Sequence, residues 1–128
     1  MVSYESSDQI KLGERLLQQN SQDVEVIAHL ALDYTTPGSE PYNLQDKNRV
    51  IQLSKELIRA NPKYPSYYAV LAEAYYMSYY ENGRHREDAI ATITALKKYL
   101  SLAKPDESFY EVAKTRVTDL EKKLNINE

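Results

Sequence analysis

The sequence predicts an all-α chain of about six helices. Apolar residues recur at spacings of three and four along most of its 128 residues, which is the pattern of amphipathic helices. Runs in which apolar and polar residues strictly alternate, as they do in half-buried strands, are missing from the sequence. One long segment also matches a later segment at a fixed offset, which indicates duplicated helical units. These three observations favour stacked pairs of helices.

The duplicated segments lie 41 positions apart. LLQQNSQDVEVIAHLALDY, residues 16–34, aligns without a gap on LIRANPKYPSYYAVLAEAY, residues 57–75. Tyr34 thus falls on Tyr75, and leucine, asparagine and alanine coincide at other positions. A weaker third copy follows near residues 93–113, where the offset slips by two. Loop lengths therefore vary while the helices keep their pattern.

Proline, glycine and asparagine mark the breaks between the expected helices. Proline has no amide hydrogen to donate within a helix, and glycine readily adopts the conformation that ends one. Such joints occur at Asn20-Ser21, Thr36-Pro37-Gly38 with Pro41, Asn61-Pro62, Asn82-Gly83 and Lys104-Pro105-Asp106. In chain order, the helices are expected at residues 8–20, 22–35, 44–60, 65–81, 86–103 and 107–124.

Each expected helix has its own apolar residues at helical spacing. In order, these include Ile10 and Leu16, Ile27 and Leu30, Val50, Leu53 and Leu57, Tyr68 and Leu71, Ile93, Leu96 and Leu100, and Phe109 and Val112. The last two helices also begin near acidic pairs, Glu87-Asp88 and Asp106-Glu107, and negative charge is favourable at a helix N-terminus. The acidic pairs are therefore interpreted as helix-start residues and not as catalytic carboxylates.

Two of the expected helices resemble helix A of the tetratricopeptide repeat family. Residues 68–75, YAVLAEAY, match that family's pattern of a large aromatic residue, then Leu-Gly or Leu-Ala, then Tyr. Residues 27–34, IAHLALDY, match the same pattern with isoleucine in the place of the aromatic residue. Ala89 and Pro105 fall where helix B of the family has a small residue and a closing proline.

The resemblance implies a short right-handed superhelix of stacked antiparallel helix pairs, a TPR-like α-solenoid. It implies one domain over residues 1–128, with repeat units near 24–62 and 65–105. Helices 8–20 and 107–124 would flank these units. The family's period is about 34 residues, so this chain would have lengthened loops between helices A and B. Sel1-like repeats and HEAT-like pairs, whose period is about 40–47 residues, remain alternatives.

Motifs for catalysis or metal binding are missing from the sequence. The chain has no cysteine, and its two histidines, His29 and His85, do not form an H-x-x-x-H or H-E-x-x-H motif. The three glycines are isolated, so the sequence has no glycine-rich phosphate loop. We therefore expect no enzymatic activity, no cofactor and no metal site.

Charge and hydropathy argue against nucleic acid and membranes as partners. The formal net charge is −3, so the chain offers no broad basic surface to a polyanion. No apolar run approaches the roughly 20 residues that a membrane span requires. The sequence therefore favours a cytoplasmic protein whose partner is a protein or a peptide.

Seven of the twelve tyrosines lie in residues 64–83, and five of them fall on two faces of the helix expected at 65–81. Tyr68, Tyr75 and Tyr79 occupy the packing positions of the repeat motif. A second stripe contains Tyr76 and Tyr80, and by resemblance it lines the concave face of the solenoid. The residues expected to line this partner-binding groove are Ala28, His29, Leu32, Ala69, Glu73, Tyr76, Met77, Tyr80, Tyr110 and Lys114.

The expected function is a non-catalytic protein–protein interaction module that binds a peptide or protein segment in this groove. Some family members hold a peptide C-terminus with a lysine and asparagine clamp, but Ala28, Leu32, Ala69 and Glu73 occupy those positions here. We therefore expect an apolar or aromatic ligand segment, with a basic residue near Glu73. The alternative is a homo-oligomeric assembly module, such as a homodimer, that uses the tyrosine-rich face for self-association.

Overall fold

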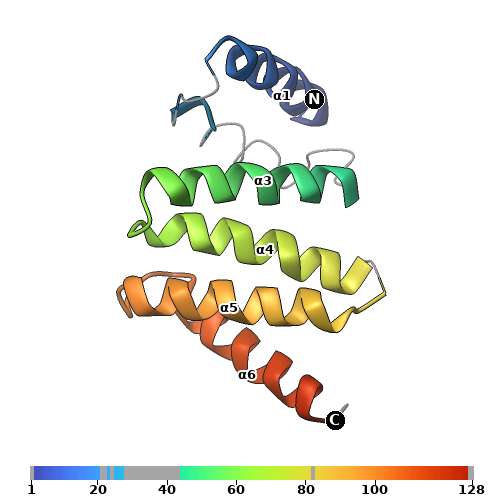
Figure 1. Cartoon of the computed structure of the whole chain (residues 1–128), viewed down its shortest axis with the longest axis vertical. Coiled ribbons are helices and arrows are strands. Elements are labelled where there is room, and N and C mark those ends of the chain that lie inside the picture. Colours follow the sequence, from blue (N-terminus) through green and yellow to red (C-terminus); the bar gives the residue numbers. More distant parts are fainter. Residues whose placement is uncertain (1, 21–22, 24, 28–43, 82, 127–128) are drawn as a thin grey trace. The chain divides into compact units, whose positions relative to one another are not determined.

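The structure is a computed structural model that describes residues 2–20, 23, 25–27, 44–81 and 83–126. Its helices are α1 (Val2–Gln19), α3 (Leu44–Ala60), α4 (Pro65–Glu81), α5 (Arg86–Leu102) and α6 (Tyr110–Ile126) (Figure 1). Residues 25–27 are helical as well, and the described part of the chain contains no strand. The prediction of an all-α chain is confirmed.

Most helix bounds agree with those expected from the joints. α3 and α4 begin and end at the predicted residues, and α5 ends one residue before its predicted end. α1 begins six residues earlier than predicted, because the apolar spacing that guided the prediction begins only at Ile10. Of the second expected helix, the structure describes the start. Asp23 caps it, since its Oδ1 accepts hydrogen bonds from the amides of Glu25 and Val26 at 3.1 and 3.2 Å.

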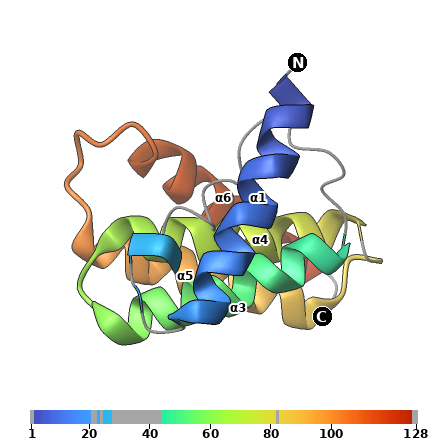
Figure 2. The ribbon, with the colours of Figure 1, turned by 90° about the horizontal axis from the view of Figure 1, so that it is seen from above.

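The chain divides into two compact units, Met1–Pro62 and Lys63–Glu128. The first contains α1 and α3, and Figure 2 shows α1 crossing α3. Arg49 on α3 donates from Nε and Nη2 to the two carboxylate oxygens of Glu14 on α1, at 2.8 and 2.5 Å. Such a two-pronged contact fixes the position of both side chains more strongly than a single hydrogen bond does. Leu17 on α1 and Leu53 on α3 are buried apolar residues of this unit.

The second unit begins with the antiparallel helices α4 and α5. Their connection contains two residues with positive φ, Gly83 at 86° and Arg84 at 57°. The Arg84 amide donates to the Tyr79 carbonyl at 2.8 Å, which closes the end of α4. At the same end of the hairpin, the buried Ser78 hydroxyl on α4 donates a hydrogen bond to the Asp88 carboxylate on α5 at 3.2 Å. The chain therefore turns back sharply and lays α5 against α4.

The third helix of this unit, α6, packs on α5 and runs in the same direction as α4. The buried apolar residues of α6 are Ala113, Val117 and Leu120. Two side-chain hydrogen bonds between described residues join α4 to α6, Glu73 with Arg116 and Tyr80 with Lys123, and each spans 43 residues of sequence. The difference in residue number between the partners is the same at two points seven residues apart, so the two helices run parallel. The second unit is thus a helical hairpin followed by a helix parallel to the first.

Candidate functional site

One face of α4 packs in the core, as its repeat motif predicts. Tyr68, Leu71, Ala72 and Tyr79 are buried. Tyr75 is half-buried, so the same stripe reaches the surface in its middle. A buried tyrosine ring contributes a large apolar area, while its hydroxyl favours the edge of the core. This stripe therefore forms both core and part of a surface hollow.

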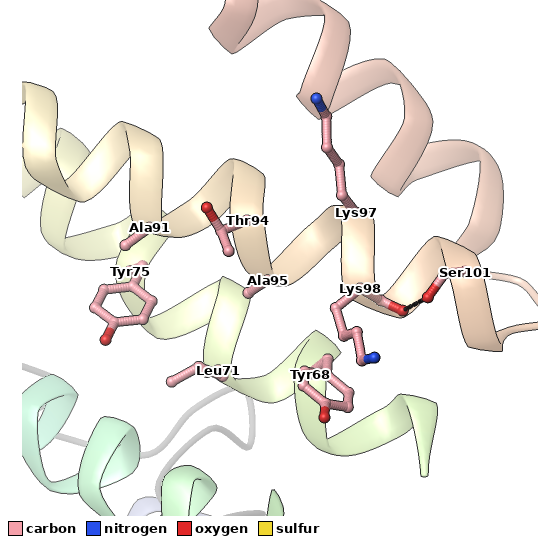
Figure 3. A pocket seen from close by; sticks show the side chains of 9 residues that line it. All are labelled: Tyr68, Leu71, Tyr75, Ala91, Thr94, Ala95, Lys97, Lys98 and Ser101. Carbon is pink, nitrogen blue, oxygen red and sulfur yellow. Dashed lines mark hydrogen bonds between the residues drawn. The ribbon is translucent and has the colours of Figure 1, made fainter. Parts of the chain in front are cut away.

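The hollow is an open groove between α4 and α5, with a cavity volume of about 610 Å³ (Figure 3). Three residues of α4 and six of α5 line it: Tyr68, Leu71, Tyr75, Ala91, Thr94, Ala95, Lys97, Lys98 and Ser101. We call this surface the α4–α5 groove. Alanines on α5 stand opposite large side chains on α4, and their small volume leaves the space between the helices open. The lining is predominantly apolar, which is typical of protein sites that hold ligands or partner segments.

The charged residues of the α4–α5 groove lie toward one end. In Figure 3 Lys98 and Ser101 lie near Tyr68, whereas Ala91 and Tyr75 lie at the other end. Lys97 points toward α6, where its Nζ lies 3.0 Å from a carboxylate oxygen of Glu121. The nine lining residues include two lysines and no carboxylate. The groove therefore combines an apolar body with a cationic end.

The strip expected to bind a partner lies on another face of α4 and contacts α6. Arg116 on α6 forms an ion pair with Glu73. Its guanidinium carbon also lies 4.3 Å from the ring centroid of Tyr76, within the range of a cation–π contact. The Tyr76 ring meets the Tyr80 ring edge-on, with 4.9 Å between the centroids. Three residues of the predicted strip are thus joined to one another or to α6.

Tyr80 is the most exposed member of this cluster and is surrounded by cations. Lys123 Nζ donates to the Tyr80 hydroxyl at 2.8 Å and lies 3.2 Å from an Asp119 oxygen. The Arg84 guanidinium carbon lies 5.2 Å from the centroid of the Tyr80 ring. The hydrogen bond from Lys123 stabilises the phenolate and lowers the pKa of Tyr80. Burial raises the pKa of the neighbouring Tyr76 to about 12.

Comparison with known proteins adds no relative to this picture. No protein-family model and no curated protein sequence matches the chain. The likeness to the tetratricopeptide family is carried by residues 27–34 and 68–75, together with Ala89 and Pro105, and stays a proposal.

The remaining predicted residues fall into two groups. Ala69 and Met77 are half-buried on α4, and Tyr110 and Lys114 lie at the start of α6. Lys114 Nζ lies 6.0 Å from the centroid of the Tyr110 ring and 3.9 Å from a Glu111 oxygen, so both contacts stay within α6. Three further predicted residues lie outside the described part of the chain: Ala28, His29 and Leu32.

Sequence reasoning missed the α5 side of the α4–α5 groove. A signal was present, because Ala91, Ala95 and Lys98 recur at helical spacing and would have indicated one face of the helix. It also missed Arg116 and Lys123, whose contacts with α4 depend on how α6 is placed.

Two other kinds of site are missing from the described ranges. There, histidine, aspartate and glutamate side chains form no group of three or more that could hold a metal ion. None of the helices described is long and apolar enough to cross a membrane.

Proposed function

We propose that the chain is a non-catalytic protein-interaction module, a TPR-like helical repeat, that binds a segment of a partner protein in the α4–α5 groove. The observation that carries the proposal is the open apolar groove of about 610 Å³ between two helices of one unit. Grooves between packed helices accept the apolar face of a further helix, whose side chains fill the gaps between those of the first two.

The chemistry of the groove supports a peptide or protein ligand. Tyr68 and Tyr75 offer aromatic surface, and tyrosine is enriched among the residues that dominate binding energy at protein interfaces. Ala91 and Ala95 allow close approach of a partner's backbone or of a leucine-sized side chain. A partner that covers this apolar lining would remove it from water, which is favourable by roughly 25 cal/mol per Å².

The α4–α5 groove is a better candidate than the strip of Glu73, Tyr76 and Tyr80. These three side chains already interact within the second unit: Glu73 and Tyr76 with Arg116, and Tyr80 with Lys123. A partner that used the strip would have to displace those contacts before it gained its own. Among the residues that the structure describes, the groove requires no such displacement at Tyr75 or Ala91.

The helix order of the second unit supports the repeat assignment. In a TPR-like unit, helix B runs back along helix A, and the next helix A is parallel to the first. α4, α5 and α6 follow this order, and the motif at residues 68–75 lies on α4. Continued stacking in the same sense would give the proposed right-handed superhelix.

Site-specific photo-cross-linking in the cells that naturally make the chain tests the proposal. A photoreactive phenylalanine analogue replaces Tyr75 in the groove, Tyr80 in the strip, or Tyr64, which is 47% exposed and precedes α4. We expect a discrete adduct from position 75. Adding Ala91→Leu, which fills the groove at little cost in helix propensity, should abolish it.

Other outcomes would contradict the proposal. An adduct from position 80 alone would assign binding to the strip. An adduct with the mass of two copies of the chain would identify self-association through the groove in place of a separate partner. Adducts that persist equally at all three positions would show non-specific contact.

A further inference from the structure

The α4–α5 groove has the length and periodicity of a helix-binding site. On α4 its lining residues are Tyr68, Leu71 and Tyr75, at intervals of three and four residues. On α5 they extend from Ala91 to Ser101, which at 1.5 Å per residue is about 15 Å. The α4 residues extend over about 10 Å, so the two walls each present one helical face over a length that matches about two to three turns of a third helix.

One lysine gives this groove its charge. Lys97 points toward α6 and lies 3.0 Å from Glu121, whereas Lys98 lies on the side of α5 that faces Tyr68 (Figure 3). Within the described residues, the Lys98 ammonium has no hydrogen bond or ion pair. The neighbouring Ser101 hydroxyl donates its hydrogen to the Lys98 backbone carbonyl at 2.7 Å. A ligand carboxylate at this position would therefore bind the Lys98 ammonium and not the Ser101 hydroxyl.

We infer that the α4–α5 groove binds an amphipathic helix of a partner protein, with a carboxylate beside Lys98 and apolar side chains along Leu71, Tyr75 and Ala91. The inference rests on the proposed function and adds the chemistry of the partner. The apolar body supplies affinity, and the lysine selects and orients the helix, because a charge at the rim of an interface acts mainly on specificity and association rate.

A neutral or basic helix would bind less well for a physical reason. It would place an amide or a second cation beside Lys98, and like charges at an interface are repulsive. The charge pair is exposed to solvent, so its contribution is modest. We expect an acidic helix to bind about fivefold more tightly than its neutral counterpart at low salt.

The test uses three synthetic helices of about 14 residues, each with leucines along one face. The acidic probe carries two glutamates at each end, and glutamine or lysine replaces them in the neutral and basic probes. Glutamates at both ends make the result independent of the direction in which the helix binds. Dissociation constants come from NMR titration of the isotope-labelled full chain, which detects binding up to millimolar values.

Lys98→Glu is the decisive variant, and Lys122→Glu is its matched control. Both change the net charge equally, but Lys122 is an exposed residue of α6 outside the groove. For the parent chain we expect affinity to fall from the acidic to the neutral to the basic probe. Lys98→Glu should reverse that order, with the acidic probe weakened about tenfold. Lys122→Glu should preserve the order.

The outcomes separate this inference from the proposed function. One outcome is equal binding of the acidic and neutral probes, with chemical-shift changes at Tyr75 that are lost in Ala91→Leu. That outcome would overturn the inference and leave the proposed groove intact. An unchanged order of affinities in Lys98→Glu would overturn the inference as well. If no probe changes the chemical shifts of the groove residues at millimolar concentration, both the inference and the proposed function are overturned.

Discussion

Arg116 on α6 lies over the ring of Tyr76 on α4, with 4.3 Å between the guanidinium carbon and the ring centroid. The same guanidinium forms an ion pair with Glu73, one helical turn before Tyr76. Because both contacts are half-buried, Arg116 connects α6 to α4 by two interactions that act together. It also explains why Tyr76, an aromatic residue outside the packing stripe of α4, is not simply exposed.

Replacing Arg116 should loosen α6 from α4. Arg116→Gln removes both the ion pair and the cation–π contact and should lower the free energy of unfolding by about 1–2 kcal/mol. Arg116→Lys retains the charge but loses the planar stacking group, so its loss should be smaller. Urea unfolding followed by circular dichroism measures both, with Lys122→Gln as the control on the exposed side of α6. Equal stability of Arg116→Gln and the parent would contradict a connecting role.

The interface between α5 and α6 depends on apolar packing. Leu96 and Leu120 are fully buried. Leu96→Ala should destabilise the chain by about 3 kcal/mol, since it loses transfer free energy and leaves a cavity. Ile90 is 45% exposed on the same helix, so Ile90→Ala should cost less than about 1 kcal/mol. Similar losses in the two variants, measured by thermal and urea unfolding, would show that Leu96 is not in the core.

Tyr80 should lose its proton before Tyr76 as the pH rises. The Lys123 hydrogen bond lowers the pKa of Tyr80, and burial raises that of Tyr76 to about 12. The folded chain thus binds the Tyr80 proton less tightly than the unfolded chain does. Tyr80 therefore adds stability as the pH rises from its folded pKa to its unfolded pKa of about 10.

Lys123→Met tests this coupling, because it removes the donor and should raise the pKa of Tyr80 toward about 10. It should also remove the stability that Tyr80 gains in that pH window. NMR titration of ring-labelled tyrosines measures the pKa, and Lys122→Met serves as the control. A Tyr80 pKa that stays the same in Lys123→Met would refute the hydrogen bond as its cause.

Gly83 should resist substitution because of its backbone conformation. Its φ is +86°, where a side chain is unfavourable, and a Cβ at this position would come no closer than 3.5 Å to the His85 ring. The cost of Gly83→Ala is therefore conformational and not a clash, and should be about 1 kcal/mol. Gly83→Asn should cost less, since asparagine tolerates positive φ better than alanine. If both variants are equally stable to urea, the turn does not require positive φ.

The sequence predicted the helices better than it predicted the site. The bounds of α3 and α4 follow from the Asn61-Pro62 joint and from apolar residues at helical spacing, and both are local signals. Tyr76 and Tyr80 could be placed on a separate face of α4 from helical geometry alone. Their contacts with α6 could not, because Arg116 and Lys123 lie beyond a complete intervening helix and two loops.

The α4–α5 groove escaped prediction for a related reason. Tyr68, Leu71 and Tyr75 occupy packing positions of the repeat motif, and that motif assigns them to the core. Whether these three side chains are completely covered depends on the size of the α5 side chains opposite them. Ala91 and Ala95 are too small to cover them. The rotation of α5 about its axis decides which α5 residues face α4.

The most direct test of partner binding in the α4–α5 groove is the set of intermolecular NOEs between the leucine methyl groups of the acidic helical probe and the tyrosine rings of the full chain. We expect NOEs to Tyr68 and Tyr75, and we expect Ala91→Leu to remove them. NOEs to Tyr80 and Tyr110, with none to Tyr68 or Tyr75, would contradict the groove and place the partner on the strip expected from the sequence.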